Sequence, residues 1–247
     1  MSDDLKGESN KLRRSFLLPF LFVVLLWLIY IIDVTFHLDL ARFGTRPREV
    51  SGLIGILTTP LLHANYEHIM SNSVPLLVLG TMVAYFYGKI LGKLILMLYL
   101  LGGFWLWVLG TPDQIHIGAS GLIYALVSFL FFSGIMSRHR GMMAVSLLTI
   151  FLYSSLALGI IPFLVAENIS WQGHLAGSLA GIVSAFYFRG EGPKREEYRW
   201  EEDEEIENQS LGDAPPEITT SNDAISGVTY HFGKKTETEE EDKEDIN

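Results

Sequence analysis

Long apolar runs separated by short polar stretches fill the first three-quarters of the chain. Each run approaches the length of a helix that crosses a bilayer, which needs roughly 20 mostly apolar residues. The pattern predicts membrane-spanning helices at residues 15–32, 68–87, 90–109, 119–136, 142–165 and 171–188. We therefore expect an all-α fold, a polytopic membrane protein built as a six-helix bundle.

The first run resembles a signal peptide, but it is too long and no small-residue cleavage site follows it. It is predicted to be an uncleaved span. With six spans, both termini lie on one side. Lys and Arg flank the connections after the second and fourth spans and follow the sixth, whereas connections 110–117 and 166–170 have none. This asymmetry predicts that both termini are cytoplasmic.

The first connection, residues 33–62, departs from this pattern because it contains Arg42, Arg46 and Arg48 although it is predicted to lie outside. Long connections obey the charge rule less strictly. This one also carries many apolar residues, so we expect it to lie partly in the membrane interface.

Composition excludes several classes of protein. Hydrophobic residues make up 49% of the chain and the mean hydropathy is +0.29, which argues against a soluble protein. The absence of Cys excludes thiolate catalysis, Cys-ligated metals and disulfides. No basic patch with interleaved aromatic residues suggests nucleic-acid binding.

Charge divides the chain into three parts. From residue 190 onward there are 19 acidic and 6 basic residues, and large aliphatic residues are few. Such a segment buries too little apolar surface to fold. We predict a cytoplasmic N-terminal segment at 1–14, a membrane domain at 15–189, and a disordered acidic cytoplasmic tail at 190–247, whose binding partner the sequence does not identify.

Polar residues recur at one depth of the predicted bundle. The second, fourth and sixth spans all begin on the outer side, and near those ends lie His68, Asn72, Ser120 and His174. Asn72 and His174 are within one or two helical turns of the interface, given a rise of ~1.5 Å per residue. Polar groups in a bilayer are costly and are expected to face the bundle interior and to mark function.

Small residues suggest how two of these groups meet. Gly177 and Gly181 lie on the same face as His174, and their spacing lets a neighbouring helix approach closely. If this face packs on the fourth span, Ser120 comes within hydrogen-bond reach of His174. An imidazole can then take the hydroxyl proton at neutral pH.

An acyl-transfer reaction also needs donors for the oxyanion that develops on the substrate carbonyl. His68, Asn72 and the backbone N–H groups of Ala119 and Ser120 could supply them. Alternatives stay open for the separate residues: Ser120 as a helix N-cap, His174 as a satisfied core histidine, and the glycines as a packing face only. A non-catalytic membrane-protein binder, and a metal or haem site using His63, His68 and His174, are the competing functions.

Together these residues resemble the rhomboid intramembrane serine proteases. The matching motifs are His63-x4-His68-x3-Asn72, Gly118-Ala119-Ser120-Gly121-x2-Tyr124 and Gly173-His174-x2-Gly177-x3-Gly181. The resemblance implies Ser120 as nucleophile, His174 as general base, and an oxyanion hole formed by His68, Asn72 and the backbone of Ala119 and Ser120. It also implies that Tyr124 stacks on His174, with His63, Gly118, Gly177 and Gly181 in supporting positions.

The resemblance further implies a serine endopeptidase of the bacterial inner membrane that needs no metal or cofactor. Its substrates would be single-span membrane proteins, cut in or near the outer end of their transmembrane helix. One departure concerns the first connection, where many relatives carry Trp-Arg and this chain has Ile54-Gly55. The sequence therefore leaves open how that connection is anchored.

Overall fold

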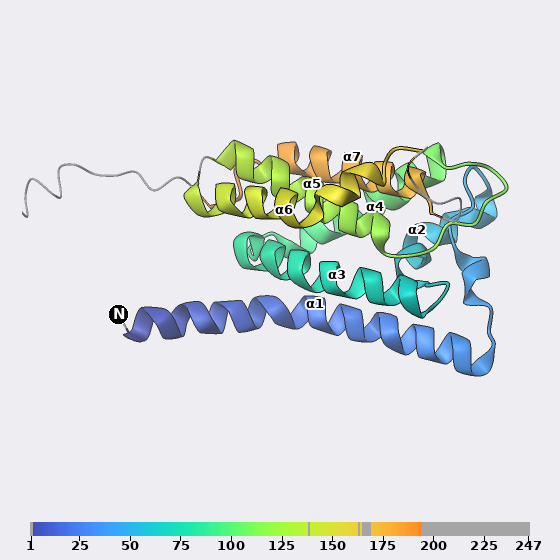
Figure 1. Ribbon diagram of the computed structural model, residues 1–247, viewed down its shortest axis with the longest axis horizontal. Helices are drawn as coiled ribbons and strands as arrows, with labels where there is room; N and C mark the ends of the chain where they lie inside the picture. Colours follow the sequence, from blue (N-terminus) through green and yellow to red (C-terminus); the bar gives the residue numbers. More distant parts are fainter. Residues whose placement is uncertain (1, 138, 163, 165–168, 194–247) are drawn as a thin grey trace, which may run out of the picture. The chain divides into compact units, whose positions relative to one another are not determined.

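The computed structural model of the chain describes residues 2–137, 139–162, 164 and 169–193. Its regular structure in these ranges is helical, apart from one isolated antiparallel bridge between Thr45 and His116. Helix α1 leads into four short elements, and five longer helices follow (Figure 1). In order they are α1 (Ser2–Phe36), η1 (Leu40–Phe43), η2 (Val50–Ile54), α2 (Gly55–Thr58), η3 (Thr59–Leu61), α3 (Tyr66–Tyr87), α4 (Leu91–Leu109), α5 (Ser120–Ser137), α6 (Arg140–Leu158) and α7 (Trp171–Tyr187).

The predicted all-α class is confirmed for the described residues. Among the residues that the structure describes, four helices are long and apolar enough to cross a bilayer: Leu5–Phe36 within α1, then α3, α4 and α5. The last two predicted spans coincide with α6 and α7, of which α7, with 17 residues, is shorter than these four helices. The count of six spans thus stays a prediction, and the acidic tail from residue 194 lies outside the described residues.

One predicted boundary is wrong. The fifth run was expected to continue to residue 165, but α6 ends at Leu158. Gly159 and Pro162 follow directly. Gly is common just after a helix, and Pro cannot continue one because it lacks the N–H group. At the other end of the chain, α1 starts at Ser2, so the described part of the predicted segment 1–14 is continuous with the first span.

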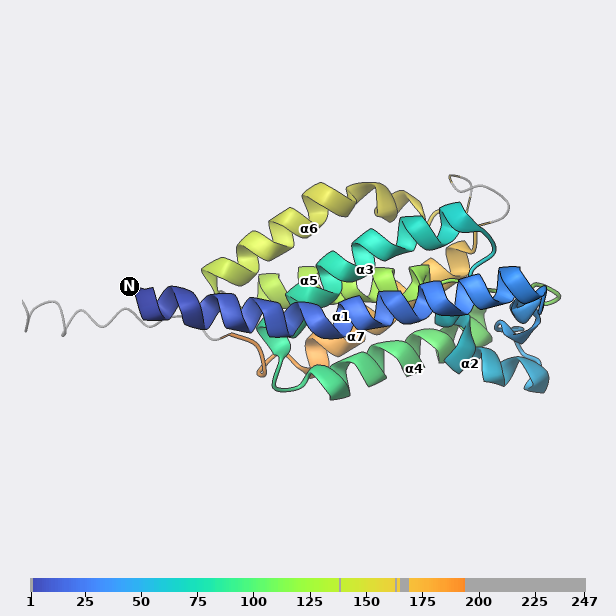
Figure 2. The same ribbon diagram turned by 90° about the horizontal axis from the view of Figure 1, so that it is seen from below.

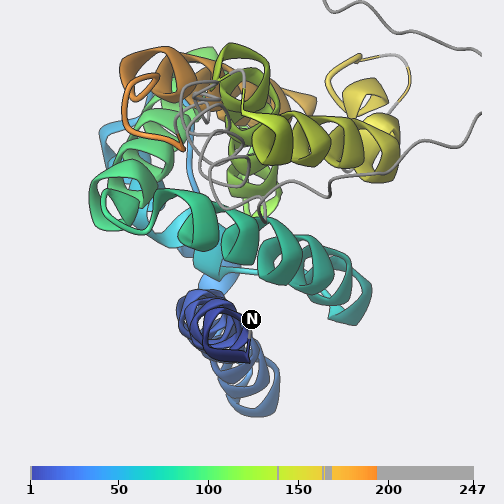
Figure 3. The same cartoon turned by 90° about the vertical axis from the view of Figure 1, so that its left-hand side faces the viewer.

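The helices pack around α5 and α7. Helix α7 lies against both α5 and α4, α6 packs on α5, and α1 runs along α3 at one edge (Figures 1 and 2). The view from the N-terminal end of α1 shows α3 between α1 and the remaining helices (Figure 3). Apolar side chains such as Leu79, Leu126 and Phe129 are fully buried between them.

The α5–α7 contact is unusually close. A Cβ atom added to Gly177 would lie 1.9 Å from the carbonyl oxygen of Gly121, and one added to Gly181 would lie 2.3 Å from that of Ala125. Backbone therefore meets backbone at two successive turns, which only glycine permits. The predicted close approach of these two helices is confirmed.

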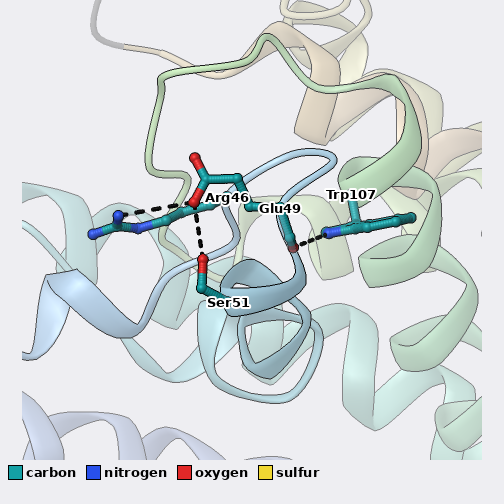
Figure 4. A network of polar contacts seen from close by, with 4 residues as sticks. All are labelled: Arg46, Glu49, Ser51 and Trp107. Carbon is teal, nitrogen blue, oxygen red and sulfur yellow. Dashed lines mark hydrogen bonds and ion pairs between the residues drawn. The ribbon is translucent and has the colours of Figure 1, made fainter.

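The first connection is anchored by polar contacts at the end of α4 (Figure 4). The indole N–H of Trp107 donates to the carbonyl oxygen of Glu49 at 2.8 Å. The Glu49 carboxylate accepts from Ser51 and lies 4.0 Å from the Arg46 guanidinium. Arg48 adds a hydrogen bond of 3.0 Å from its guanidinium to the carbonyl oxygen of Gly110.

These contacts show how the first connection is anchored although it has Ile54-Gly55 where many relatives carry Trp-Arg. A Cβ atom on Gly55 would lie 2.2 Å from the backbone of Thr45, so the fold has no room for a side chain there. The anchoring is instead provided by Trp107, Arg48 and the Glu49 cluster.

Replacing Gly177 by Ala should destabilise the protein, because the methyl group would have to displace the backbone of Gly121. Overpacking of this kind costs about 1–3 kcal/mol. Gly102→Ala is the matched control, since its Cβ would meet α7 only at an ordinary 3.9 Å. Thermal unfolding in detergent micelles should show a clearly lower Tm for Gly177→Ala alone; equal Tm values would contradict the close α5–α7 contact.

Candidate active site

Ser120 and His174 meet where α5 and α7 begin. The Nε2 atom of His174 lies 3.1 Å from Oγ of Ser120. His174 is 6% exposed, and its position in the first turn of α7 is fixed by Ser170, whose hydroxyl caps the helix by accepting from the N–H of Gly173 at 3.0 Å. Helix α5 starts at Ser120 itself, and the hydroxyl is used in the contact with His174. The N-cap interpretation of Ser120 is therefore wrong.

Two further groups hold the imidazole of His174. The ring of Tyr124 stacks on it, with 4.0 Å between ring centroids and an interplanar angle of 10°. On the side away from Ser120, Nδ1 lies 2.9 Å from the carbonyl oxygen of Gly159. Because a carbonyl oxygen only accepts, Nδ1 carries the proton and Nε2 presents a lone pair to Ser120.

His68 and Gly118 are in direct contact. A Cβ atom on Gly118 would lie 2.5 Å from Nε2 of the His68 ring, so only glycine lets that ring rest on the backbone two residues before Ser120. Gly118 also has φ +111°, which side chains rarely tolerate. His68 thus lies beside the peptide that leads into α5.

Asn72 is the remaining polar side chain that the sequence placed near Ser120. It follows His68 by one helical turn on α3 and is 3% exposed, yet its Nδ2 atom has no hydrogen-bond partner among the described residues. An unpaired buried amide donor costs free energy unless something binds it. The orphaned N–H groups of Asn72 are thus available to a ligand.

All of these side chains line one cavity of about 780 Å³. It lies among the N-terminal ends of α3, α5 and α7, and its walls include His68, Asn72, Ser120, Tyr124 and His174. The structure therefore brings together the side chains that the sequence placed at one depth. Ala119, fully buried, lies at the entry to α5.

Two further histidines, His63 and His116, lie at this cavity or next to it. His63 precedes α3, is 6% exposed and packs edge-on against His68, with 5.1 Å between centroids. Burial, and then the neighbouring His68, lower the pKa of His63 to about 4. His116, in the connection before α5, is buried and bridged to Thr45, and burial lowers its pKa too.

Sequence reasoning missed two kinds of contributor. Asn65 caps α3 by accepting from the N–H of His68 at 2.8 Å, and Ser170 caps α7; a polar residue just before a helical run is a recognisable signal for both. Gly159 acts through its backbone carbonyl, which leaves no trace in the side-chain pattern. In the described part of the chain, no three His, Asp or Glu side chains are grouped to hold a metal ion, and the expectation of no cofactor stays a prediction.

Comparisons with known proteins place the chain in a family. Residues 50–191 match the family model described as the rhomboid domain, a range that contains every residue of the site. The chain belongs to the rhomboid family. An uncharacterized protein of Mycobacterium tuberculosis is 37% identical to this rhomboid over 171 residues, which are 67% of this chain and 71% of the relative.

Two further relatives support the assignment. An uncharacterized Mycobacterium leprae protein is 35% identical over 171 residues, covering 67% of this chain and 68% of its own length. The Bacillus subtilis protein named "Putative rhomboid protease YdcA" is 26% identical over 141 residues, 53% of this chain and 65% of that protein. With its apolar helices, this rhomboid is an integral membrane protein.

The buried His63 predicts a dependence of stability on pH. Its pKa is about 4 in the folded protein against an ordinary 6.5, so the unfolded chain binds more protons between these values. The stabilisation is complete above pH 6.5 and is lost as pH falls toward 4, by up to about 3 kcal/mol. The Tm of His63→Phe should fall less over this range than that of the wild type, because the other histidines titrate in both. Parallel Tm profiles would contradict the prediction.

Proposed function

We propose that the protein is an intramembrane serine endopeptidase. Its substrates are single-span membrane proteins, cut in or near the outer end of their transmembrane helix. Ser120 is the nucleophile and His174 is the general base. The observation that carries the proposal is the 3.1 Å contact between Ser120 Oγ and His174 Nε2 inside a bundle of apolar helices.

The surroundings of His174 favour this assignment. The proton on Nδ1 is held by the Gly159 carbonyl, so Nε2 is free to accept the proton of Ser120. Tyr124 fixes the plane of the ring by stacking. In many serine hydrolases a carboxylate selects the tautomer; here a backbone carbonyl and an aromatic ring do so without placing a second charge in the membrane.

The chemistry follows in two half-reactions. Oγ of Ser120 attacks the carbonyl carbon of the scissile peptide while Nε2 of His174 takes the hydroxyl proton. The tetrahedral intermediate collapses as Nε2 returns that proton to the leaving amine nitrogen. A water molecule, deprotonated by the same nitrogen, then hydrolyses the acyl-enzyme, which releases the carboxylate product and regenerates Ser120.

Asn72, His68 and the backbone N–H groups of Ala119 and Ser120 serve as the oxyanion hole. Asn72 is the best supported of these donors, because its amide is buried in the cavity wall without a partner in the described structure. The first N–H groups of α5 have no acceptor within their own helix and carry its positive dipole end. Such preorganised donors stabilise the charge that develops on the substrate oxygen.

The proposal includes an orientation. The distribution of Lys and Arg among the connections supports cytoplasmic termini in a bacterial inner membrane, with six spans. The cavity would then open toward the outer leaflet. This matches cleavage near the outer end of a substrate helix, where water is close.

Ser120→Ala should reduce cleavage of a co-expressed single-span reporter by about 10⁴-fold or more, to below detection, since it removes the nucleophile. The matched control is Ser178→Ala, one helical turn beyond His174. Ser178 is also buried, and its hydroxyl has no partner in the described structure. The Ser178→Ala variant should cleave the reporter at the wild-type rate. Cleavage that persists in inserted Ser120→Ala protein would favour a non-catalytic role for this site.

Asn72→Leu, which keeps the size of the side chain but removes its donors, should lower kcat by about 10²–10³-fold while leaving KM nearly unchanged. Asn72→Asp should show a similar loss, because a carboxylate cannot donate to an oxyanion. Steady-state kinetics on a purified reporter in lipid vesicles measure both parameters. An unchanged kcat in either folded variant would exclude Asn72 from the oxyanion hole.

A further inference from the structure

Thr59 joins two connections that are far apart in the sequence. It is the first residue of η3, near the end of the first connection, and is 6% exposed. Its neighbours Thr45 and His116 are equally buried. Thr45 belongs to the same connection, whereas His116 lies four residues before Ser120.

The hydroxyl of Thr59 has all its bonding capacity in use. It donates to the carbonyl oxygen of His116 at 3.0 Å and accepts from the N–H of Thr45 at 2.8 Å. Its only proton is thereby committed, so in the 2.8 Å contact between the two threonine hydroxyls Thr45 is the donor. Thr59 thus makes three hydrogen bonds in a site from which water is excluded, where a missing partner is expensive.

The backbone of Thr59 reaches further toward the site. Its carbonyl oxygen accepts from the N–H of Gly118 at 2.9 Å. The Thr45 N–H that donates to the Thr59 hydroxyl is shared with the carbonyl oxygen of His116 at 3.0 Å, and the N–H of His116 donates to the carbonyl oxygen of Thr45 at 2.9 Å. The peptide from His116 to Gly118 is therefore held at both ends, and Gly118 in turn supports the His68 ring.

This arrangement bears on the donors of the proposed oxyanion hole. The N–H of Gly118 is used by Thr59, which leaves the N–H groups of Ala119 and Ser120 as the next along the chain. Their direction depends on how Gly118, at φ +111°, is fixed. A misplacement of about 1 Å in a reacting constellation can cost 10²-fold in rate.

The neighbouring threonine shows the contrast. The hydroxyl of Thr58, a half-buried residue, donates to the carbonyl oxygens of Phe43 and Ile54, both within the first connection. The Thr58 hydroxyl therefore stabilises the first connection internally. Thr59, by contrast, bonds through its hydroxyl to the segment that leads into α5.

We propose that Thr59 is a positioning residue for proteolysis: its hydroxyl fixes the 116–118 peptide and thereby aims the oxyanion donors beside Ser120. The inference rests on the proposed function. Loss of the hydroxyl lowers kcat by about 10–100-fold and changes KM much less, because Thr59 itself does not line the cavity that receives the substrate.

The test compares Thr59→Val, Thr59→Ser, Thr58→Val and wild type in lipid vesicles, with kcat, KM and Tm measured for each. Thr59→Val should lose kcat, Thr59→Ser should recover most of it, and Thr58→Val should keep the wild-type kcat whatever its Tm. An unchanged kcat in Thr59→Val, or an equal loss in Thr58→Val, overturns the inference. If Thr59→Val does not fold, Thr45→Val is the test variant, because it removes the hydroxyl that donates to Thr59. Thr45→Val should show a smaller loss in kcat than is expected for Thr59→Val. An unchanged kcat in Thr45→Val would overturn the inference.

The wild-type measurement separates the two proposals. Wild-type protein that does not cleave the reporter contradicts the proposed function, and this inference falls with it. Active wild type with an unaffected Thr59→Val variant contradicts the inference alone.

Discussion

The approach of α5 to α7 is the constraint on which the site depends. Ser120 and His174 are short side chains on different helices, and their 3.1 Å contact requires backbones that touch. Gly177 and Gly181 make this possible by leaving the space beside Gly121 and Ala125 empty. In a bilayer no hydrophobic driving force brings helices together, so such close backbone packing is what sets the register of the two helix ends.

The second requirement is a rigid approach to Ser120. The peptide before α5 is held by the first connection through Thr45 and Thr59, and that connection is held in turn by Trp107 and Arg48 at the end of α4. The long, irregular first connection is thus held in place, and its buried Thr45 and Thr59 are hydrogen-bonded to each other. Among the described residues that line the cavity, Asn72 keeps an unpaired buried donor, which the proposed reaction uses.

The helices and most side chains of the candidate site could be predicted from the sequence, for physical reasons. Apolar runs located the helices, and the recurrence of Ser120, His174, His68 and Asn72 at one depth indicated that they meet. Other features could not be found in this way. The end of α6 depends on Gly159 and Pro162 within an otherwise apolar run, and the carbonyl of Gly159 acts without a side chain. The roles of Thr59 and His116 come from contacts between distant connections, for which a single sequence holds no periodic signal.

The central claim is that His174 activates Ser120 within the membrane. The most direct measurement is peptide mapping by mass spectrometry after treating bilayer-reconstituted protein with a fluorophosphonate, which bonds covalently to an activated serine hydroxyl. The account predicts one adduct, on Ser120, that is lost in His174→Phe although that protein remains folded. An adduct that forms equally well without His174, or that lies on another serine, would contradict it.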